Sequence, residues 1–197
     1  MVAGVATTGT VCYSASMTAP RLVYFALVGH GAAGLRHLLD RGVRPVLVVT
    51  DGRTWQSDPA VSAFNRRRDE LLAEFPDLVT LCAQEQLPLY RDEPGRPVAE
   101  LAAAVAAAQP DLGLIVTYFR ILPPSVFSRP RYGTYNIHPS LLPAGRGPQP
   151  VYWTLRRGDA ESGASLHRLD AGVDTGPVFA RRRVAVTASD TYADLYR

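Results

Sequence analysis

Apolar runs alternate with amphipathic stretches along the chain up to residue 137. Short, largely apolar runs predict strands buried on both sides of a parallel sheet, and they cover residues 21–29, 44–51, 87–90, 111–118 and 132–137. Helical spacing of apolar positions or Ala-rich composition predicts helices between them, over residues 32–41, 60–75 and 96–109. Strands alternating with helices predict an α/β fold, a Rossmann-like, mostly parallel twisted sheet with helices on both faces.

The pattern changes after residue 139. Residues 140–150 are rich in Gly and Pro, which predicts an irregular loop. A short helix over 151–158 and two strands over 163–170 and 177–186 follow. The last residues only begin a helix, which Ser189 or Asp190 could cap. We therefore expect one domain over residues 21–197, whose last helix is either lost or cut short.

Composition narrows the chemistry. All 21 basic residues are Arg, so lysine Schiff bases and Walker-type phosphate loops are excluded. The net charge of +3 is far from a nucleic-acid signature, and no apolar run reaches the roughly 18 residues of a membrane span. The two cysteines, Cys12 and Cys82, have no metal-type spacing. The uncharged residues 1–20 predict a disordered tail, and we expect a cytoplasmic protein without a metal.

A glycine-rich segment, GHGAAG at residues 29–34, follows the first predicted strand and opens the first predicted helix. Such a turn can hold a pyrophosphate, and Asp51 at the end of the second strand could bind a ribose hydroxyl. This arrangement is typical of nucleotide-dependent oxidoreductases. The alternative is that the glycines only allow a tight strand-to-helix turn, and the residues alone leave both interpretations open.

Asn136 and His138 lie two residues apart at the end of a predicted strand. Positions i and i+2 of a strand point to the same side, so both side chains should project together at the carboxyl edge, where open α/β sheets bind ligands. An amide donor and a titratable imidazole can together hold a carbonyl oxygen that becomes an oxyanion. The alternative is a capping Asn beside a structural His.

Two aspartates flank Gly172 in the segment LDAGVDTGP at residues 169–177. An Asp on a loop between strands can reach a His on a neighbouring strand, orient the imidazole and stabilise its protonated form. The alternative is a hydrogen bond within the turn itself, as Asp often makes. For Asp170 we favour the turn, and for Asp174 both interpretations stay open.

Several segments together resemble the 10-formyltetrahydrofolate-dependent formyltransferases; they are TYFRILP (117–123), NIHPSLLP (136–143), RGPQP (146–150), GDAESG (158–163) and LDAGVDTGPV (169–178). The resemblance extends over roughly residues 21–197. It implies the formyltransferase catalytic domain, with 10-formyltetrahydrofolate as co-substrate. It also implies a catalytic centre formed by Asn136, His138 and Asp174, whose oxyanion is stabilised during transfer of the formyl group to an amine.

The resemblance further implies two sets of binding residues. Folate would lie against Tyr118, Phe119, Arg120, Ile121, Leu122, Ser140, Leu141, Leu142, Asp170 and Val173. The acceptor would lie against Gly29, His30, Gly31, Arg146 and Gly147.

The motifs are mixed with respect to the acceptor. FRIL and NIHPSLLP resemble phosphoribosylglycinamide formyltransferases, whereas RGPQP and DAGVDTG resemble methionyl-tRNA and sugar-nucleotide formyltransferases. We expect a small-molecule amine: an amino sugar, a phosphoribosylglycinamide-like compound or a specialised metabolite. The alternatives are methionyl-tRNA as acceptor, hydrolysis by a deformylase, and the nucleotide-dependent oxidoreductase. Neither a nucleic-acid partner nor a membrane is expected, and the sequence does not indicate an oligomeric state.

Overall fold

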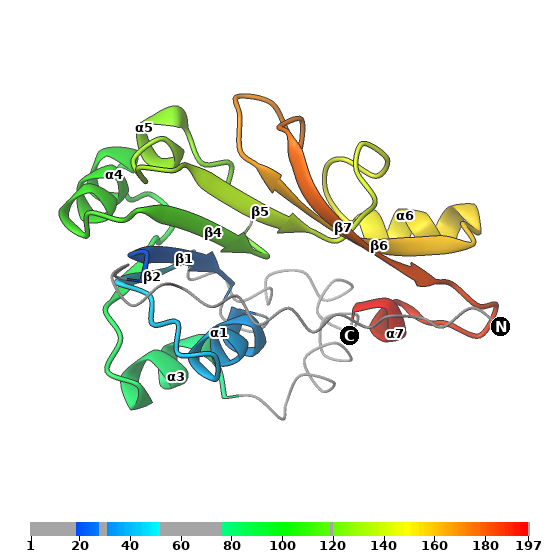
Figure 1. The fold of residues 1–197 in the computed structure, drawn as a ribbon, viewed down its shortest axis with the longest axis horizontal. Coiled ribbons are helices and arrows are strands. Elements are labelled where there is room, and N and C mark those ends of the chain that lie inside the picture. The colour runs from blue at the N-terminus through cyan, green and yellow to red at the C-terminus, as the bar shows by residue number, and fades with distance from the viewer. Residues whose placement is uncertain (1–18, 28–30, 52–75, 119, 197) are drawn as a thin grey trace, which may run out of the picture.

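The architecture is a seven-stranded sheet in the order β3-β2-β1-β4-β5-β6-β7. It is seen in a computed structural model that describes residues 19–27, 31–51, 76–118 and 120–196. The strands are β1 (Leu22–Ala26), β2 (Leu47–Thr50), β3 (Leu89–Arg91), β4 (Leu112–Val116), β5 (Thr134–His138), β6 (Glu161–Arg168) and β7 (Val178–Ala185). The first five run parallel, and β6 and β7 are antiparallel to their neighbours. The predicted fold class is therefore confirmed (Figure 1).

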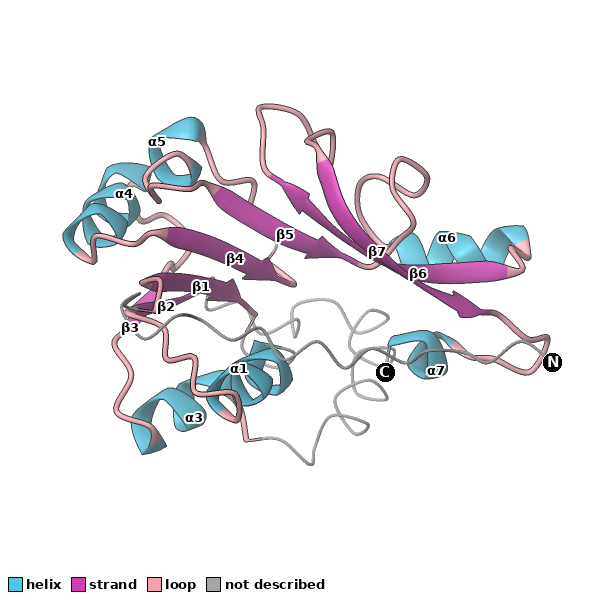
Figure 2. Ribbon diagram, viewed as in Figure 1, coloured by secondary structure: helices cyan, strands magenta, loops and turns pink. Residues whose placement is uncertain are grey.

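Helices lie on both faces of the sheet (Figure 2). They are α1 (Gly31–Leu39), α3 (Leu78–Gln84), α4 (Val98–Ala107), α5 (Pro124–Phe127), α6 (Pro150–Arg157) and α7 (Tyr192–Tyr196). The sequence did not predict α3 or α5. For α3 a signal was present, because Asp77 caps its amino end by accepting hydrogen bonds from the N–H groups of Val79 and Thr80. Two predicted segments lie outside the described residues: the tail over residues 1–20, except for its last two residues, and the whole helix over residues 60–75.

Strand β1 is buried on both faces, which accounts for its continuous apolar sequence. On one face Phe25 packs with residues of α4, such as Leu101. On the other face Tyr24 packs with Leu35 of α1 and Leu78 of α3. These two clusters are the core on which the site is built.

The β5–β6 ladder positions polar side chains for function. Asn136 pairs with His167 and His138 with Ser165 in the antiparallel register. Directly opposed residues in such a ladder point to the same face, so these four side chains share one side of the sheet. Ile115 of β4 pairs with Asn136 and belongs to the core cluster under α4 and α5. The four polar side chains therefore lie on the face of the sheet that α4 and α5 cover.

No helix among the described residues combines the length and apolarity needed to cross a bilayer.

Candidate active site

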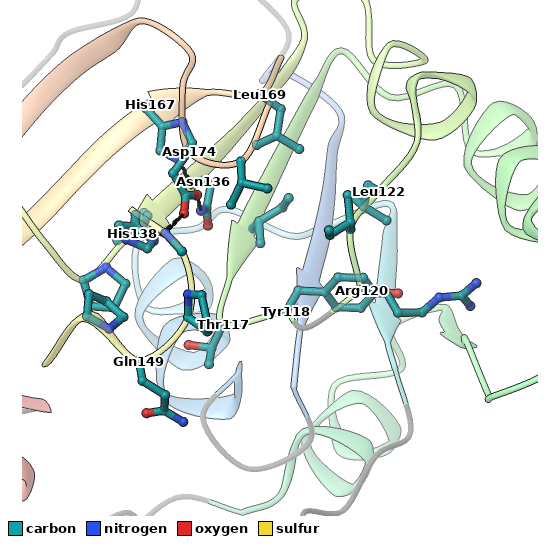
Figure 3. Close-up of a pocket in the computed structure, with 18 of the residues that line it drawn as sticks. Thr117, Tyr118, Arg120, Leu122, Asn136, His138, Gln149, His167, Leu169 and Asp174 are labelled. Carbon is teal, nitrogen blue, oxygen red and sulfur yellow. Dashed lines mark hydrogen bonds and ion pairs between the residues drawn. The ribbon is translucent and has the colours of Figure 1, made fainter. Parts of the chain in front are cut away.

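A cavity of about 450 Å³ opens on the face of the sheet that carries Asn136 and His138 (Figure 3). The segment after β4, the end of β5, the turn into α6 and the β6–β7 loop form its walls. The lining includes Thr117, Tyr118, Arg120, Ile121, Leu122, Asn136, His138, Gly147, Gln149, His167, Asp170, Val173, Asp174 and Tyr192. A pocket of this size is within the range of small-molecule sites.

Asp174 lies between two imidazole rings. Its Oδ2 atom is 3.6 Å from Nδ1 of His138, and its Oδ1 atom is 3.4 Å from Nε2 of His167. The backbone N–H of Gly147 donates to Oδ2 at 2.9 Å. The residue has a left-handed backbone (φ 52°), which Asp tolerates better than most side chains.

The pKa of the Asp174 carboxyl lies below its ordinary value. Burial alone would raise this pKa, but the contact with His167, the hydrogen bond from the Gly147 N–H and the positive charge that His138 can carry more than offset it. The carboxylate is therefore ionised at neutral pH, and it faces both imidazoles as a charge.

His138 is buried, and both of its ring nitrogens face oxygen atoms. Opposite the Asp174 contact, Nε2 lies 2.8 Å from the carbonyl oxygen of Gly145. Because a carbonyl only accepts hydrogen bonds, Nε2 carries a hydrogen in this arrangement. The ring can thus donate this N–H to a ligand that replaces the Gly145 carbonyl as the hydrogen-bond acceptor.

Asn136 completes the cluster. Its amide nitrogen lies 3.2 Å from Nε2 of His167 and 3.5 Å from Oδ1 of Asp174. The structure therefore brings together the three side chains singled out from the sequence, Asn136, His138 and Asp174, on one wall of one cavity. An amide, an imidazole and a carboxylate so arranged can stabilise an oxyanion and handle its proton.

The comparison with known protein families gives a family for this architecture. The sequence model described as "Formyl transferase" matches residues 43–197, which is most of the chain. The chain belongs to the formyl transferase family.

Relatives of this formyl transferase chain are methionyl-tRNA formyltransferases. The protein from Halorhodospira halophila is 34% identical over 178 residues, which cover 90% of this chain and 53% of the relative. The protein from Pseudomonas savastanoi pv. phaseolicola is 35% identical over 181 residues, which cover 91% and 54%. The chain thus spans about half the length of the curated relatives it matches.

Solved structures of the same fold include a phosphoribosylglycinamide formyltransferase from Streptococcus pneumoniae, with a TM-score of 0.70 at 22% identity, covering 90% of this chain and 88% of that one. A formyltetrahydrofolate deformylase from Pseudomonas syringae pv. tomato also has a TM-score of 0.70 at 22% identity, covering 91% and 55%. At this identity the likeness shows the fold. Transferases and a deformylase therefore share the architecture of this formyl transferase chain.

The formyl transferase cavity includes part of the expected folate set. Tyr118, Arg120, Ile121, Leu122, Asp170 and Val173 line it, and Phe119 lies outside the described residues. Asp170 also makes the expected turn, since its Oδ1 accepts from the N–H of Gly172 and the hydroxyl of Thr175.

Ser140, Leu141 and Leu142 are not among the residues that line the cavity. Their loop folds back onto β6, where the Ser165 hydroxyl donates to the Ser140 carbonyl and accepts from the Leu142 N–H. The Arg181 guanidinium on β7 donates to the Leu142 carbonyl. These contacts hold the loop against β6 and β7, and contact of the three residues with folate stays a prediction.

Three of the five expected acceptor residues, Gly31, Arg146 and Gly147, are described by the structure. Gly29 and His30 lie outside the described residues. Gly31 is buried at the start of α1, where an added Cβ would lie 2.3 Å from Cβ of Ala26, so this glycine is required by packing. Gly147 lines the cavity, whereas Arg146 is exposed and donates to the backbone carbonyl of Asp174.

Two site residues were missed in the sequence. His167 contacts both Asn136 and Asp174, but its place opposite Asn136 depends on the β5–β6 register, which the sequence does not reveal. Asp92 is buried; it accepts a hydrogen bond of 2.5 Å from the Tyr118 hydroxyl and forms an ion pair with Arg120. Figure 3 shows the Arg120 guanidinium directed away from the catalytic cluster. Asp92 thus anchors the cavity wall from behind.

Within the described residues, no group of three or more His, Cys, Asp or Glu side chains is placed to hold a metal ion.

Proposed function

We propose that this chain transfers a formyl group from 10-formyltetrahydrofolate to an amine, with Asn136, His138 and Asp174 as the catalytic centre. The observation that carries the proposal is the meeting of these three side chains on one cavity wall, with Asp174 within 3.6 Å of both His138 and Asn136. Membership of the formyl transferase family supports it. It is also consistent with Arg120, Ile121 and Leu122 of the FRIL motif, which line the same cavity.

In the proposed reaction the acceptor nitrogen attacks the formyl carbon, and the carbonyl oxygen becomes an oxyanion. A hydrogen of the Asn136 amide and the Nε2–H of His138 donate to that oxygen, which is electrostatic stabilisation of developing charge. For His138 this means exchanging the Gly145 carbonyl for the oxyanion. The intermediate then collapses: the bond from the formyl carbon to folate N10 breaks, the new C–N bond remains, and the proton lost by the amine is delivered to N10.

Asp174 acts through the imidazole. Its lowered pKa keeps it charged, so it stabilises a protonated His138 at the moment when negative charge appears on the substrate. Its hydrogen bond from the Gly147 N–H fixes the carboxylate, and through it the orientation of the ring.

The identity of the acceptor amine is a separate question from the chemistry of transfer. The sequence motifs are mixed and the expected acceptor is a small molecule, but the relatives at 34% and 35% identity are named methionyl-tRNA formyltransferases. We therefore propose the aminoacyl amine of methionyl-tRNA as the acceptor, in place of the small molecule. The carbonyl chemistry is the same for either amine, and the two differ only in what surrounds the cavity.

The test is product analysis. The chain is incubated with 10-formyltetrahydrofolate and either methionyl-tRNA or a panel of amino sugars and phosphoribosylglycinamide, and formylated products are measured by mass spectrometry alongside free formate. Formylmethionyl-tRNA is the expected product. A formylated small amine would instead show that the acceptor is a small molecule, as the sequence predicted. Formate released without a formylated product would mean a deformylase and would refute transfer.

Variants of the centre provide the residue-level test. Asn136→Ala and His138→Ala each remove one oxyanion donor and are expected to lower kcat by about a hundredfold. Unchanged turnover in either folded variant would refute its role. Tyr135→Phe serves as control, because Tyr135 adjoins Asn136 in β5 and its hydroxyl donates to the Tyr132 carbonyl.

A further inference from the structure

His167 is a buried imidazole that the proposed mechanism does not use. It lies on β6 opposite Asn136, it is 2% exposed, and it lines the cavity. Its two ring nitrogens have different neighbours: Nδ1 lies 3.1 Å from the carbonyl oxygen of Arg168, whereas Nε2 lies 3.2 Å from the amide nitrogen of Asn136 and 3.4 Å from Oδ1 of Asp174.

These neighbours define the hydrogen positions on the ring. A backbone carbonyl only accepts, so Nδ1 must carry a hydrogen that it donates to Arg168. In the neutral ring Nε2 then has a lone pair, which accepts a hydrogen from the Asn136 amide at 3.2 Å. Only in the doubly protonated ring would Nε2 donate, to Oδ1 of Asp174 at the longer distance of 3.4 Å. The amide nitrogen of Asn136 also faces Oδ1 of Asp174, which as a carboxylate oxygen only accepts, and this independently places the amide NH2 on the side of His167.

The two hydrogens of the Asn136 amide are therefore not equivalent. One is held by His167 at 3.2 Å, whereas the other faces Asp174 at 3.5 Å, the outer limit of a hydrogen bond. The weakly held hydrogen can exchange Asp174 for an oxyanion at little cost. Without an acceptor at position 167, only the 3.5 Å contact with Asp174 would oppose a rotation that presents the amide oxygen to the oxyanion, which would be repulsive.

We infer that His167 is a positioning residue for the formyl transfer proposed above: its Nε2 accepts one amide hydrogen of Asn136 and so leaves the other available to the oxyanion. The inference rests on the proposed function for its effect on rate. The hydrogen-bond arrangement itself can be measured without any substrate.

The substrate-free test is the tautomer of His167 at neutral pH, read from two-bond ¹H–¹⁵N correlations of the histidine-labelled protein. The signal is assigned by its loss in His167→Gln. We expect a neutral ring protonated at Nδ1. A ring protonated at Nε2, or at both nitrogens, would overturn the inference, because Nε2 could then not accept from Asn136.

The kinetic test compares His167→Leu with His167→Gln. Leu removes the acceptor while keeping an apolar volume, and Gln restores a neutral acceptor through its side-chain oxygen. We expect kcat to fall by about tenfold or more in the Leu variant with KM for the folate within about threefold, and Gln to recover most of kcat. The exposed His37→Leu, on α1, is the matched control and should leave kcat unchanged.

The outcomes separate the two proposals. A Leu variant that keeps kcat, or one that raises only KM, overturns the positioning role. If the Leu variant does not fold, the Gln variant and the tautomer of the unaltered protein still decide. A protein that forms no formylated product while His167 is the Nδ1–H tautomer would refute the proposed function and leave the hydrogen-bond arrangement established.

Discussion

The backbone N–H of Gly147 donates a hydrogen bond of 2.9 Å to the carboxylate of Asp174. This bond joins the Gly- and Pro-rich loop after β5 to the loop between β6 and β7, two segments that are well separated in the sequence. It fixes the carboxylate at the point where the His138 ring can use it. Because the donor is a backbone group, the contact depends on loop conformation and not on the identity of residue 147.

Replacing the charge at residue 174 tests its electrostatic role. Asp174→Asn keeps the shape and tolerates the left-handed backbone, but removes the negative charge between the two imidazoles. We expect kcat to fall by about a hundredfold with little change in folate binding. Steady-state kinetics and a folate-analogue titration measure both quantities. Asp159→Asn, at a partly exposed residue paired with Arg157, is the control, and equal losses in the two variants would contradict the prediction.

The lowered pKa of Asp174 also predicts a dependence of stability on pH. The folded pKa lies below the unfolded value, so the folded protein gains stability from this group above the unfolded pKa, about 3.9 for Asp. That gain is lost as the pH falls through the folded pKa. Urea unfolding between pH 6 and pH 3 should therefore show a smaller loss of stability for Asp174→Asn than for the unaltered chain. Parallel curves for the two proteins would show that Asp174 makes no such contribution.

The bond between Tyr118 and Asp92 predicts a coupled loss of stability and folate affinity. Burial, together with the bond to Asp92, raises the pKa of Tyr118, so the hydroxyl stays protonated as a donor. Tyr118→Phe leaves one oxygen of a buried carboxylate without this donor, and we expect about 1–3 kcal/mol less stability. The cavity wall around Ile121 should also loosen, so that a folate analogue binds more weakly.

Tyr135→Phe is the matched control for that experiment. Tyr135 lies on β5 and loses only an exposed hydrogen bond to the Tyr132 carbonyl. Denaturant unfolding and fluorescence titration on both variants give the comparison. A Tyr118→Phe protein that matches Tyr135→Phe in both measurements would show that Asp92 does not support the wall.

A methyl group at Gly31 tests whether this glycine serves packing. Its Cβ would approach Cβ of Ala26 to 2.3 Å, so α1 must shift from β1. We expect Gly31→Ala to lose about 1–3 kcal/mol of stability. Folate-analogue affinity of the folded protein should stay the same, because Gly31 does not line the cavity. Weaker folate binding at unchanged stability would instead indicate a ligand contact at this turn.

The sequence predicted the fold because each local pattern agrees with the final structure. β1 is apolar at every position since both of its faces are covered, and the spacing of Asn136 and His138 in β5 alone places both on one side. Such features depend on strand geometry within a few residues, which a sequence records directly.

Features that depend on register or loop path could not be read in this way. The contact of His167 with Asn136 requires the antiparallel alignment of β5 and β6, and one residue of slip would turn the ring to the other face. The resemblance implied that Ser140 lies at the folate site, but the residue does not line the cavity because its loop turns back onto Ser165. Asp92 follows a strand of only three residues, and its partners lie on a different strand end.

The arrangement at the edge of the sheet has a consequence for motion. Among the strands of the described residues, β7 pairs only with β6, and its residues are largely exposed, so β7 has fewer buried contacts than the central strands. His167 and Asp174 belong to the β6–β7 hairpin, whereas Asn136 and His138 belong to β5. If the hairpin frays by itself, catalytic competence disappears while β1 to β5 remain folded. Amide hydrogens of β7 should accordingly exchange faster than those of β1, and warming should abolish turnover before the core melts.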